Sequence, residues 1–377
     1  MTTPGALDGI VVADFSRVLA GPYATMMLGD FGAEVIKIER PGSGDDTRAW
    51  GPPYDADDQA TYFNSVNRNK RSVVLDLHSA DGVAQARDIV RRADVVVENF
   101  RAGTMERLGL GYQDLRAIRP DVIYCAITGF GSGEGAELAG YDLLVQAVGG
   151  LMSITGPEPG APTKVGVAVV DVLTGLHALS GILAALHHRN VTGQGQKLET
   201  NLLSTLLSSL VNQSSAYLGA GVVPGILGNR HPSIAPYEVF PTADRPLVLA
   251  VGNDKQFRAL VRALGCEHLA ESELYSDNRS RVTNRESLFA ELSERLTERG
   301  SDEWFAIFTE IGVPAGPIND IGQAFDLAKR LGLGATVDIE GGAAPQVANP
   351  ITMSITPPQY RLAPPRLSDE SVPGPTD

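Results

Sequence analysis

An apolar run that passes directly into a helix-spaced pattern constrains this chain more than any other feature. Residues 165–170 (VGVAVV) form a continuous apolar run, which is typical of a strand buried on both faces. From Val172 to Leu186, apolar residues then recur at helical spacing. The pattern predicts a buried strand, a core-facing helix and Asp171 at their junction. Open α/β sheets bind their ligands at such carboxyl ends of strands.

Asp171 has two possible roles at this junction. Asp is a favoured N-cap residue, because its side chain accepts hydrogen bonds from the amides of the first helical turn. The same carboxylate could serve as a nucleophile, and a helix N-terminus is expected to keep it ionised. Position alone leaves both roles open, and the two are compatible.

The first part of the chain has the pattern of a βαβ unit. Residues 9–15 (GIVVADF) and 33–39 (AEVIKIE) predict strands, and a loop and a helix separate them. The fold class expected is therefore α/β, with a Rossmann-like parallel sheet. The intervening loop contains a single glycine, Gly21, and no G-x-G-x-x-G motif, so no nicotinamide cofactor is predicted.

Periodicity also predicts how the chain divides into domains. We expect residues 1–200 to form a large Rossmann-like domain that is completed by about 331–377. Residues 201–218 have the pattern of one long amphipathic helix, and 201–224 are expected to link the domains. Residues 225–330 have a separate periodicity, which predicts a smaller α+β domain.

Charge and cysteine content exclude several classes of function. The formal net charge of -14 argues against nucleic acid and anionic membrane surfaces as partners. Two cysteines among 377 residues exclude a disulfide framework and suit a reducing compartment. Cys125 lies in the apolar run VIYCAIT, so we expect a buried structural thiol. The six histidines have no metal-ligand spacing, so we expect no metal.

No targeting or membrane segment is predicted. The first residues, MTTPGALDG, lack the basic start and apolar run of a signal peptide. The longest apolar segments, near 143–154 and 172–186, read as too short and too interrupted to span a bilayer. The expected location is therefore the cytoplasm.

Two further stretches are candidate ligand sites. Residues 67–71 (NRNKR) bring three cations together directly before a predicted strand at 72–77. Such a cluster is either a solvated surface patch or a phosphate site, and in an acidic protein we favour phosphate binding. The glycine-rich stretch 129–135 (GFGSGEG) predicts a mobile loop rather than a phosphate cradle, because no helix pattern follows it directly.

Several stretches, which occur in order and span most of the chain, together resemble one family. They are LDGIVVADFSRVLAGPYATMMLGDFGAEVIKIERPGSGDDTR, NRNKRSVVLDL, VENFRAGTMERLGLGY, GYDLLVQAVGGLMSITG, TKVGVAVVDVLTGLHALSGILAALHHRNVTGQGQKLE and GNRHPSIAPYEVF. The chain is similar to the class III (CaiB/BaiF-type) CoA-transferases, which include formyl-CoA and carnitine CoA-transferases. The α-methylacyl-CoA racemase is a relative of this family.

The resemblance implies an activity and a set of site residues. It places the nucleophilic aspartate on Asp171. Tyr141 is the second candidate catalytic residue: its phenol either orients the carboxyl groups or is a half-buried packing group. Positions that contact CoA fall, by similarity, on Val18, Ala20, Arg40, Lys70, Arg71, Asn99, Phe100 and Arg107. The implied reaction moves CoA from an acyl-CoA thioester to a free carboxylic acid through an acyl-aspartyl anhydride and an aspartyl-CoA thioester. It also implies an interlocked homodimer, with coenzyme A as substrate and no metal.

Departures from relatives bear on the choice of reaction. Tyr141 and Asp142 stand where the racemase has His-Asp, and a phenol of pKa about 10 is a poor base for an α-proton. Transfer is therefore favoured over racemisation, with a non-catalytic acyl-CoA-binding protein as the third alternative. Leu19 aligns with a Gln of formyl-CoA transferase, and an apolar side chain cannot hydrogen-bond a second carboxylate. We therefore expect the acyl partner to be a partly apolar acid that is larger than oxalate or formate. A second carboxylate, Glu238, is expected on the surface.

Overall fold

The computed structural model describes residues 4–367, which form two compact units. Within that range, the larger unit contains residues 4–151, 164–223 and 333–367, and the smaller contains 152–163 and 224–332. The larger unit therefore includes the stretch 201–223 that the sequence suggested as a linker. Of the C-terminal stretch expected at 331–377, residues 368–377 lie outside the described range.

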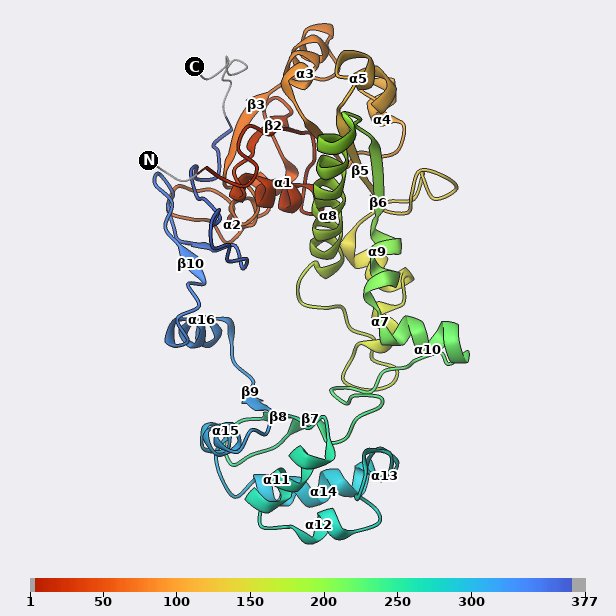
Figure 1. The fold of residues 1–377 in the computed structure, drawn as a ribbon, viewed down its shortest axis with the longest axis vertical. Coiled ribbons are helices and arrows are strands. Elements are labelled where there is room, and N and C mark those ends of the chain that lie inside the picture. Colours follow the sequence, from red (N-terminus) through yellow and green to blue (C-terminus); the bar gives the residue numbers. More distant parts are fainter. Residues whose placement is uncertain (1–3, 368–377) are drawn as a thin grey trace. The chain divides into compact units, whose positions relative to one another are not determined.

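A parallel six-stranded sheet forms the centre of the larger unit (Figure 1). Its strands are β1 (Val11–Asp14), β2 (Glu34–Glu39), β3 (Lys70–Val74), β4 (Val95–Glu98), β5 (Ile123–Thr128) and β6 (Lys197–Asn201). They lie in the order β3-β2-β1-β4-β5-β6, and each neighbouring pair is parallel. The predicted Rossmann-like sheet is thus confirmed. The strand order reverses between β1 and β4, where a crevice opens at the carboxyl ends.

Helices cover both faces of the sheet. In chain order the helices of this unit are α1 (Ala20–Asp30), η1 (a 3-10 turn, Asp46–Ala49), α2 (Thr61–Asn64), α3 (Ala80–Arg92), α4 (Thr104–Arg107), α5 (Tyr112–Ile118), α6 (Asp142–Val148), α7 (Leu151–Ile154, at the unit boundary), α8 (Val169–Thr192), α9 (Leu202–Ser209) and α10 (Asn212–Ala220). A short hairpin of β10 (Thr336–Val337) and β11 (Gln346–Val347) follows late in the chain.

Successive side chains along each strand point to opposite faces of the sheet, so each strand contributes to two separate apolar cores. On β4, Val95 and Val97 pack into the core beneath α1 and α8, whereas Val96 packs into the core beneath α3 and α5. On β5, Cys125 points to the first core and Tyr124 to the second. Strands buried on both faces need apolar residues at every position, which explains the continuous runs in the sequence. Cys125 is a buried free thiol, as expected.

The apolar run 165–170 is not a strand, so this prediction was wrong. Helix α8 already begins at Val169, and Val167 is 57% exposed. The strand that extends the sheet beyond β5 is β6, which follows α8 in the chain. A short apolar run has no periodicity that distinguishes a buried strand from the start of a helix. Asp171 therefore lies within the first turn of α8 and not at the end of a strand.

Helix α8 is longer than its apolar pattern suggested. Within residues 4–367 it is the one helix that is long and apolar enough to cross a membrane by length and composition alone. The prediction that this segment is too short was wrong, because the helix covers 24 residues. It packs against α1 and its residues Ala178, Ile182 and Ala185 are fully buried beside the sheet, so it serves as a core helix.

The expected long helix at 201–218 is broken in two. Asn201 ends β6, and its side chain accepts a hydrogen bond from the Ser204 amide at the start of α9. Val211 then separates α9 from α10 with a φ of 43°, which is a rare conformation for a β-branched residue. The apolar spacing stops at Val211, because residues 212–215 are all polar and no residue of α10 is buried. The expected single helix therefore joined two segments with different patterns.

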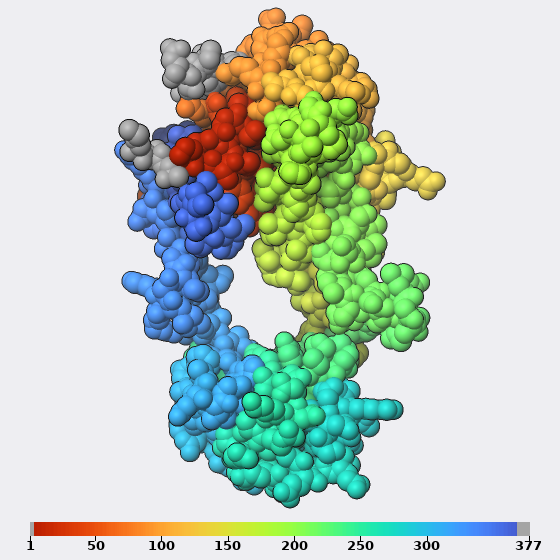
Figure 2. Space-filling model, in the orientation of Figure 1, coloured from red at the N-terminus to blue at the C-terminus, as the bar shows by residue number. Residues whose placement is uncertain are grey.

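The C-terminal segment returns to the larger unit and packs beside its first strands. Figure 2 shows blue C-terminal residues against red N-terminal ones. The Asn69 amide donates to the Leu362 carbonyl at 2.8 Å, and the Arg68 guanidinium donates to the Val347 carbonyl at 3.0 Å. Arg68 also forms a buried ion pair with Asp30 at 2.7 Å. Part of the basic stretch 67–71 therefore anchors the end of the chain.

The smaller unit has a three-stranded antiparallel sheet, β7-β8-β9, and its own apolar core. Its elements are β7 (Tyr237–Phe240), β8 (Leu247–Ala250), α11 (Asp254–Ala263), α12 (His268–Glu271), α13 (Asn278–Thr283), α14 (Arg285–Leu296), α15 (Ser301–Glu310), β9 (Ala315–Pro317) and α16 (Ile321–Arg330). Its core includes Phe240, Phe257 and Trp304. Helices packed on an antiparallel sheet give the unit an α+β architecture.

The packing of α8 gives a stability prediction. Ile182→Ala should lower the free energy of unfolding by about 2–5 kcal/mol, because the lost side chain leaves a cavity beside the sheet. Leu183→Ala is the matched control on the same helix, since Leu183 is 37% exposed, and should cost about 1 kcal/mol or less. Urea unfolding followed by circular dichroism measures both losses. Equal losses would contradict the assignment of the buried face.

Candidate active site

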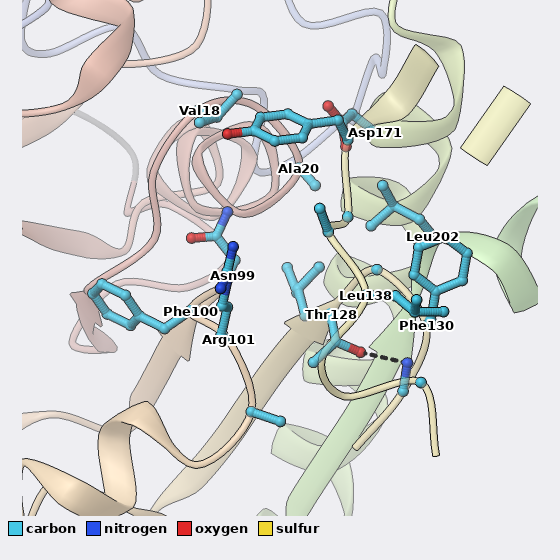
Figure 3. A pocket seen from close by; sticks show the side chains of 18 of the residues that line it. Val18, Ala20, Asn99, Phe100, Arg101, Thr128, Phe130, Leu138, Asp171 and Leu202 are labelled. Carbon is cyan, nitrogen blue, oxygen red and sulfur yellow. Dashed lines mark hydrogen bonds between the residues drawn. The ribbon is translucent and has the colours of Figure 1, made fainter. Parts of the chain in front are cut away.

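A pocket of about 230 Å³ opens at the carboxyl ends of β1, β4 and β5 (Figure 3). Three loops that follow these strands line it, together with residues from η1, α8 and α9. The lining residues are Arg17, Val18, Leu19, Ala20, Asp46, Asn99, Phe100, Arg101, Ala102, Ile127, Thr128, Gly129, Phe130, Gly131, Gly135, Ala136, Leu138, Ala139, Gly140, Tyr141, Asp171 and Leu202. The pocket thus occupies the switch point of the sheet, where this fold class binds ligands.

Six of the site residues predicted from the sequence meet in this pocket. They are Val18, Ala20, Asn99, Phe100, Tyr141 and Asp171. They come from four separate segments of the chain, and only the closing of the sheet brings them together. Tyr141 is 64% exposed, so it is not the half-buried packing residue that a structural role would require.

Asp171 is the third residue of α8, after Val169 and Val170, and its N-cap position is taken by Ala168. Of the two roles left open for Asp171, that of the N-cap is therefore excluded. Burial, and then the neighbouring carboxylate of Asp142, raise the pKa of Asp171 to about 7. The expectation that the helix N-terminus keeps this group fully ionised is wrong, because desolvation and a like charge outweigh the helix dipole.

Asp142 is a neighbour of Asp171 to which the sequence analysis gave no role at the site. It is the first residue of α6, and its Oδ1 accepts hydrogen bonds from the amides of Val170 at 2.8 Å and Asp171 at 3.2 Å. Asp142 therefore supplies the cap that Ala168 lacks. The pKa of the Tyr62 phenol is raised by burial and then by Asp171 and Asp142, which puts this phenol near both carboxylates.

The first pocket loop is held in a strained conformation by buried charges. Val18 has a φ of 69°, a left-handed value that costs a β-branched residue about 1–3 kcal/mol. Its amide donates to both Asp45 carboxylate oxygens, at 3.2 and 3.3 Å. Lys37 pairs with Asp45 at 2.9 Å and donates to the Ser16 carbonyl at 2.9 Å. The ion pair therefore fixes both ends of the turn.

A second set of contacts joins the loops after β1 and β4. The Asn99 side chain accepts from the Arg17 amide at 2.8 Å and donates to the Arg17 carbonyl at 2.6 Å. The Arg17 guanidinium lies 4.7 Å from the centroid of the Phe100 ring, an arrangement that favours a cation–π interaction. Arg17 also lies 3.8 Å from Asp46. A cation missed by the sequence analysis is thereby presented to the pocket.

The glycine-rich loop after β5 forms another wall. A Cβ at Gly129 would approach the Gly140 Cα to 2.4 Å, so both ends of the loop require glycine. Its Gly131 amide donates to Thr128 Oγ1 at 3.0 Å (Figure 3). The next helix, α6, begins only at Asp142, so the loop does not lead directly into a helix N-terminus. The prediction that no helix directly follows residues 129–135 is confirmed.

Four of the basic residues predicted from the sequence do not line the pocket. Lys70 is buried, and its Nζ donates to Asp14 at 3.1 Å and to the Pro22 carbonyl at 2.9 Å. Burial, only partly offset by Asp14, lowers the pKa of Lys70 to about 8. Arg71 is exposed on β3. Arg107 borders a separate hollow beside α3. Arg40 forms an ion pair with the pocket residue Asp46.

Glu238 lies in the smaller unit and is buried, so its expected surface position is wrong. It is 6% exposed and accepts a hydrogen bond from Arg230 at 3.2 Å. Burial raises the pKa of this carboxyl group, and the opposing attraction of Arg230 offsets that rise only partly. The period-2 pattern of β7 alone could not separate an inward-facing Glu from an outward-facing one.

Comparison with known proteins decides the family. Residues 7–371 match the model of CoA-transferase family III. The chain belongs to this family. A succinate–glutarate CoA-transferase of Agrobacterium fabrum is 46% identical over 375 residues, which cover 97% of this chain and 94% of that protein. The human succinyl-CoA:glutarate CoA-transferase is 42% identical over 345 residues, which cover 91% of this chain and 78% of that protein.

A solved structure agrees with the fold. The CaiB/BaiF family protein of Brucella suis superposes with a TM-score of 0.87 at 42% identity, covering 98% of this chain and 97% of that one. The protein is therefore a class III CoA-transferase, an enzyme family whose substrates are acyl-CoA thioesters and carboxylic acids. The family resemblance inferred from the sequence motifs is confirmed.

The buried ion pair beneath Val18 of this class III CoA-transferase gives a second prediction. Burial alone would raise the pKa of Asp45, but the Lys37 ammonium and hydrogen bonds from Thr47 more than offset it, so the pKa lies below its usual range. Asp45→Asn should cost about 3–5 kcal/mol of stability at neutral pH, because Lys37 is left buried without its partner. Asp46→Asn, at an exposed neighbour, should cost about 1 kcal/mol or less.

The pH dependence of this loss has a defined sign. A carboxylate with a depressed pKa in the folded state stabilises the protein above its unfolded pKa, about 3.9, and this stabilisation is lost as pH falls through the folded value. The difference between the wild type and Asp45→Asn should therefore shrink below about pH 4. Urea unfolding at several pH values measures it. A difference that stays constant down to about pH 2 would contradict the assigned pair.

Proposed function

We propose that this enzyme transfers CoA from an acyl-CoA thioester to a free carboxylic acid, with Asp171 as the group that is acylated. The observation that carries the proposal is the position of the Asp171 carboxylate, which lines a pocket at the switch point of the sheet. Its pKa of about 7 makes it a stronger base and nucleophile than an ordinary aspartate, while about half of it remains ionised near neutral pH.

The chemistry proceeds in covalent steps that balance. An Asp171 carboxylate oxygen attacks the thioester carbonyl of the donor and the C–S bond breaks. CoA departs as a thiolate, and a mixed acyl-aspartyl anhydride remains on the enzyme. The thiolate then attacks the aspartyl carbonyl, which expels the donor acid and forms an aspartyl-CoA thioester. The acceptor carboxylate attacks that thioester, and the thiolate finally attacks the acceptor acyl group and regenerates Asp171.

The pocket residues have separate roles in this scheme. Val18, Ala20, Asn99 and Phe100 line the groove and are proposed to contact CoA. Arg17 and Arg101 are cations of the lining and Arg40 is tied to it through Asp46, so they are suited to the CoA phosphates. Lys70 pairs with Asp14, which accepts a hydrogen bond from the Ser16 amide in the loop after β1, so Lys70 supports this loop. For Arg71 and Arg107 the proposal rests on the family resemblance alone.

Tyr141 and the glycine-rich loop form the remaining walls. We propose that the exposed Tyr141 phenol orients carboxyl groups beside Asp171, because both line the same pocket. The loop between Gly129 and Gly140 would limit the access of water to the anhydride. A water-shielded pocket matters here, because the anhydride would otherwise hydrolyse.

A dicarboxylic acid of four or five carbons is the proposed acyl partner. The supporting observation is that both relatives compared above are named for succinate or succinyl-CoA and glutarate. The sequence favoured a partly apolar acid because of Leu19. However, Leu19 is 6% exposed and packs with Met26 and Val66, so it presents little apolar surface to the pocket. The argument for an apolar acid is weakened accordingly.

We also propose a cytoplasmic homodimer. The family resemblance supports an interlocked dimer. Apolar side chains are exposed on α9, on α10, between these helices and just after α10, and we propose that the second subunit covers this surface. These side chains are Leu207, Val211, Tyr217, Leu218, Val222 and Val223. Two buried free thiols among the described residues suit a reducing compartment.

Replacement of the nucleophile tests the proposed function. Asp171→Ala should lower kcat for CoA transfer by at least about 1,000-fold, because the other carboxylate of the lining, Asp46, is paired with Arg40. CoA affinity, measured by calorimetry, should stay within about threefold of the wild type, since the groove is unchanged. Asp88→Asn, at an exposed ion pair on α3, is the acidic control and should retain activity.

Chemical trapping separates the alternatives. Hydroxylamine added during turnover should convert Asp171, and no other carboxylate, to a hydroxamate detectable by peptide mass spectrometry. Retained transfer in Asp171→Ala would overturn the proposal. Exchange of the α-proton of an acyl-CoA with deuterated solvent in the absence of any acceptor acid would instead identify a racemase.

The elevated pKa gives a pH prediction. Only the ionised Asp171 can attack, so release of CoA thiol in a single turnover should rise with pH and reach half its maximum near pH 7. An unperturbed aspartate would already give a plateau above about pH 5. Single-turnover assays with a stoichiometric acyl-CoA donor between about pH 5 and pH 9 measure the profile. A flat profile over that range would contradict the raised pKa.

A further inference from the structure

The start of α8 lacks a cap of its own and takes one from another helix. A helix N-terminus leaves its first amides without intrahelical acceptors, and a Ser, Thr, Asp or Asn at the N-cap normally accepts from them. The N-cap residue of α8 is Ala168, whose side chain has no acceptor. Asp142 Oδ1, from α6, accepts from the amides of Val170 and Asp171 instead. The backbone of the proposed nucleophile is thus held directly by a second carboxylate.

Asp142 is itself fixed by a side-chain clamp. Its Oδ2 accepts from Gln146 Nε2 at 2.5 Å, and Gln146 Oε1 accepts from the Val165 amide at 2.9 Å. Gln146 is 1% exposed, so both ends of its amide are committed to these contacts. Through this clamp, one turn of α6 holds both the segment entering α8 and the first turn of α8. All four hydrogen bonds lie within the larger unit.

We propose that Asp142 is a positioning residue for CoA transfer, which holds the Asp171 backbone through two amide hydrogen bonds and places a second negative charge beside the attacking carboxylate. The inference rests on the proposed role of Asp171. Asp142 is absent from the pocket lining, so it acts through Asp171 and not on the substrate.

The second charge has a definite effect on reactivity. Among the described residues, Asp142 is the charged group that raises the pKa of Asp171 beyond the effect of burial. The other titratable neighbours are Tyr62, whose raised pKa keeps it neutral, and Tyr141 and Arg17, which line the same pocket. A like charge disfavours ionisation of Asp171 and so makes it a stronger base once ionised. Removing the charge should therefore lower both the midpoint of the pH profile and the nucleophilicity at the plateau.

The clamp allows charge and geometry to be tested separately. Asp142→Asn keeps an oxygen to accept from the α8 amides, but it removes the charge and turns an NH₂ group toward Gln146 Nε2, where two donors then oppose each other. The double variant Asp142→Asn/Gln146→Glu restores every hydrogen bond, because the new carboxylate accepts both from that NH₂ group and from the Val165 amide. It also returns the negative charge, one side chain farther from Asp171.

Asp142→Asn should lower kcat by about 10- to 100-fold, with KM for the acyl-CoA within about threefold of the wild type. Its pH midpoint should lie below the wild-type value of about 7. The double variant should regain most of kcat, with a midpoint between the two. Gln146→Glu alone, which opposes two carboxylates, is the matched control and should not exceed Asp142→Asn in kcat.

Several outcomes decide the inference. A wild-type kcat and pH midpoint in Asp142→Asn would overturn it, as would a double variant no more active than the single one. Circular dichroism checks whether Asp142→Asn folds. If it does not fold, the double variant decides the inference: the midpoint of its pH profile must lie below that of the wild type, and an unchanged midpoint would overturn the inference. The proposed function fails on a different result, namely transfer that survives Asp171→Ala.

Discussion

The burial of ionised groups beneath the carboxyl edge of the sheet is the constraint on which the site depends. Charges taken out of water must be paired and hydrogen-bonded, because each would otherwise cost several kcal/mol. Asp14, at the end of β1, pairs with Lys70 of β3, and Lys37 of β2 pairs with Asp45. Side chains from three neighbouring strands are thereby joined to the loops at this site. That loop adopts a conformation that Val18 would not take by itself.

This arrangement explains why cations that looked like ligand groups serve the fold instead. In the sequence, Arg68, Lys70 and Arg71 form one basic cluster at a strand end. Alternation along the chain separates them in space: Lys70 points to the buried Asp14, while Arg71 faces solvent on β3. Arg68 pairs with Asp30 and holds the C-terminal segment. The pocket draws its positive charge from Arg17 and Arg101, which come from two other loops.

The reactive carboxylate depends on a second connection, between α6 and α8. An alanine N-cap offers no side-chain acceptor to the first amides of a helix, so Asp142 provides one across 29 residues of sequence. The same carboxylate that completes the helix sets the electrostatic environment of Asp171. Structural support and reactivity of the proposed nucleophile are thus consequences of a single contact. Such coupling ties the chemistry of the site to the packing of the core.

What the sequence by itself determined was local. The apolar runs and spacing identified the strands β1 and β2 and the helix α1 between them, because strand alternation and helical periodicity are properties of neighbouring residues. Ordered motifs identified the family and six residues that meet in the pocket. Only the tertiary structure decided that 165–170 enters a helix, that Lys70 is buried and that Asp142 caps α8. These depend on contacts between residues distant in the chain, which no local pattern encodes.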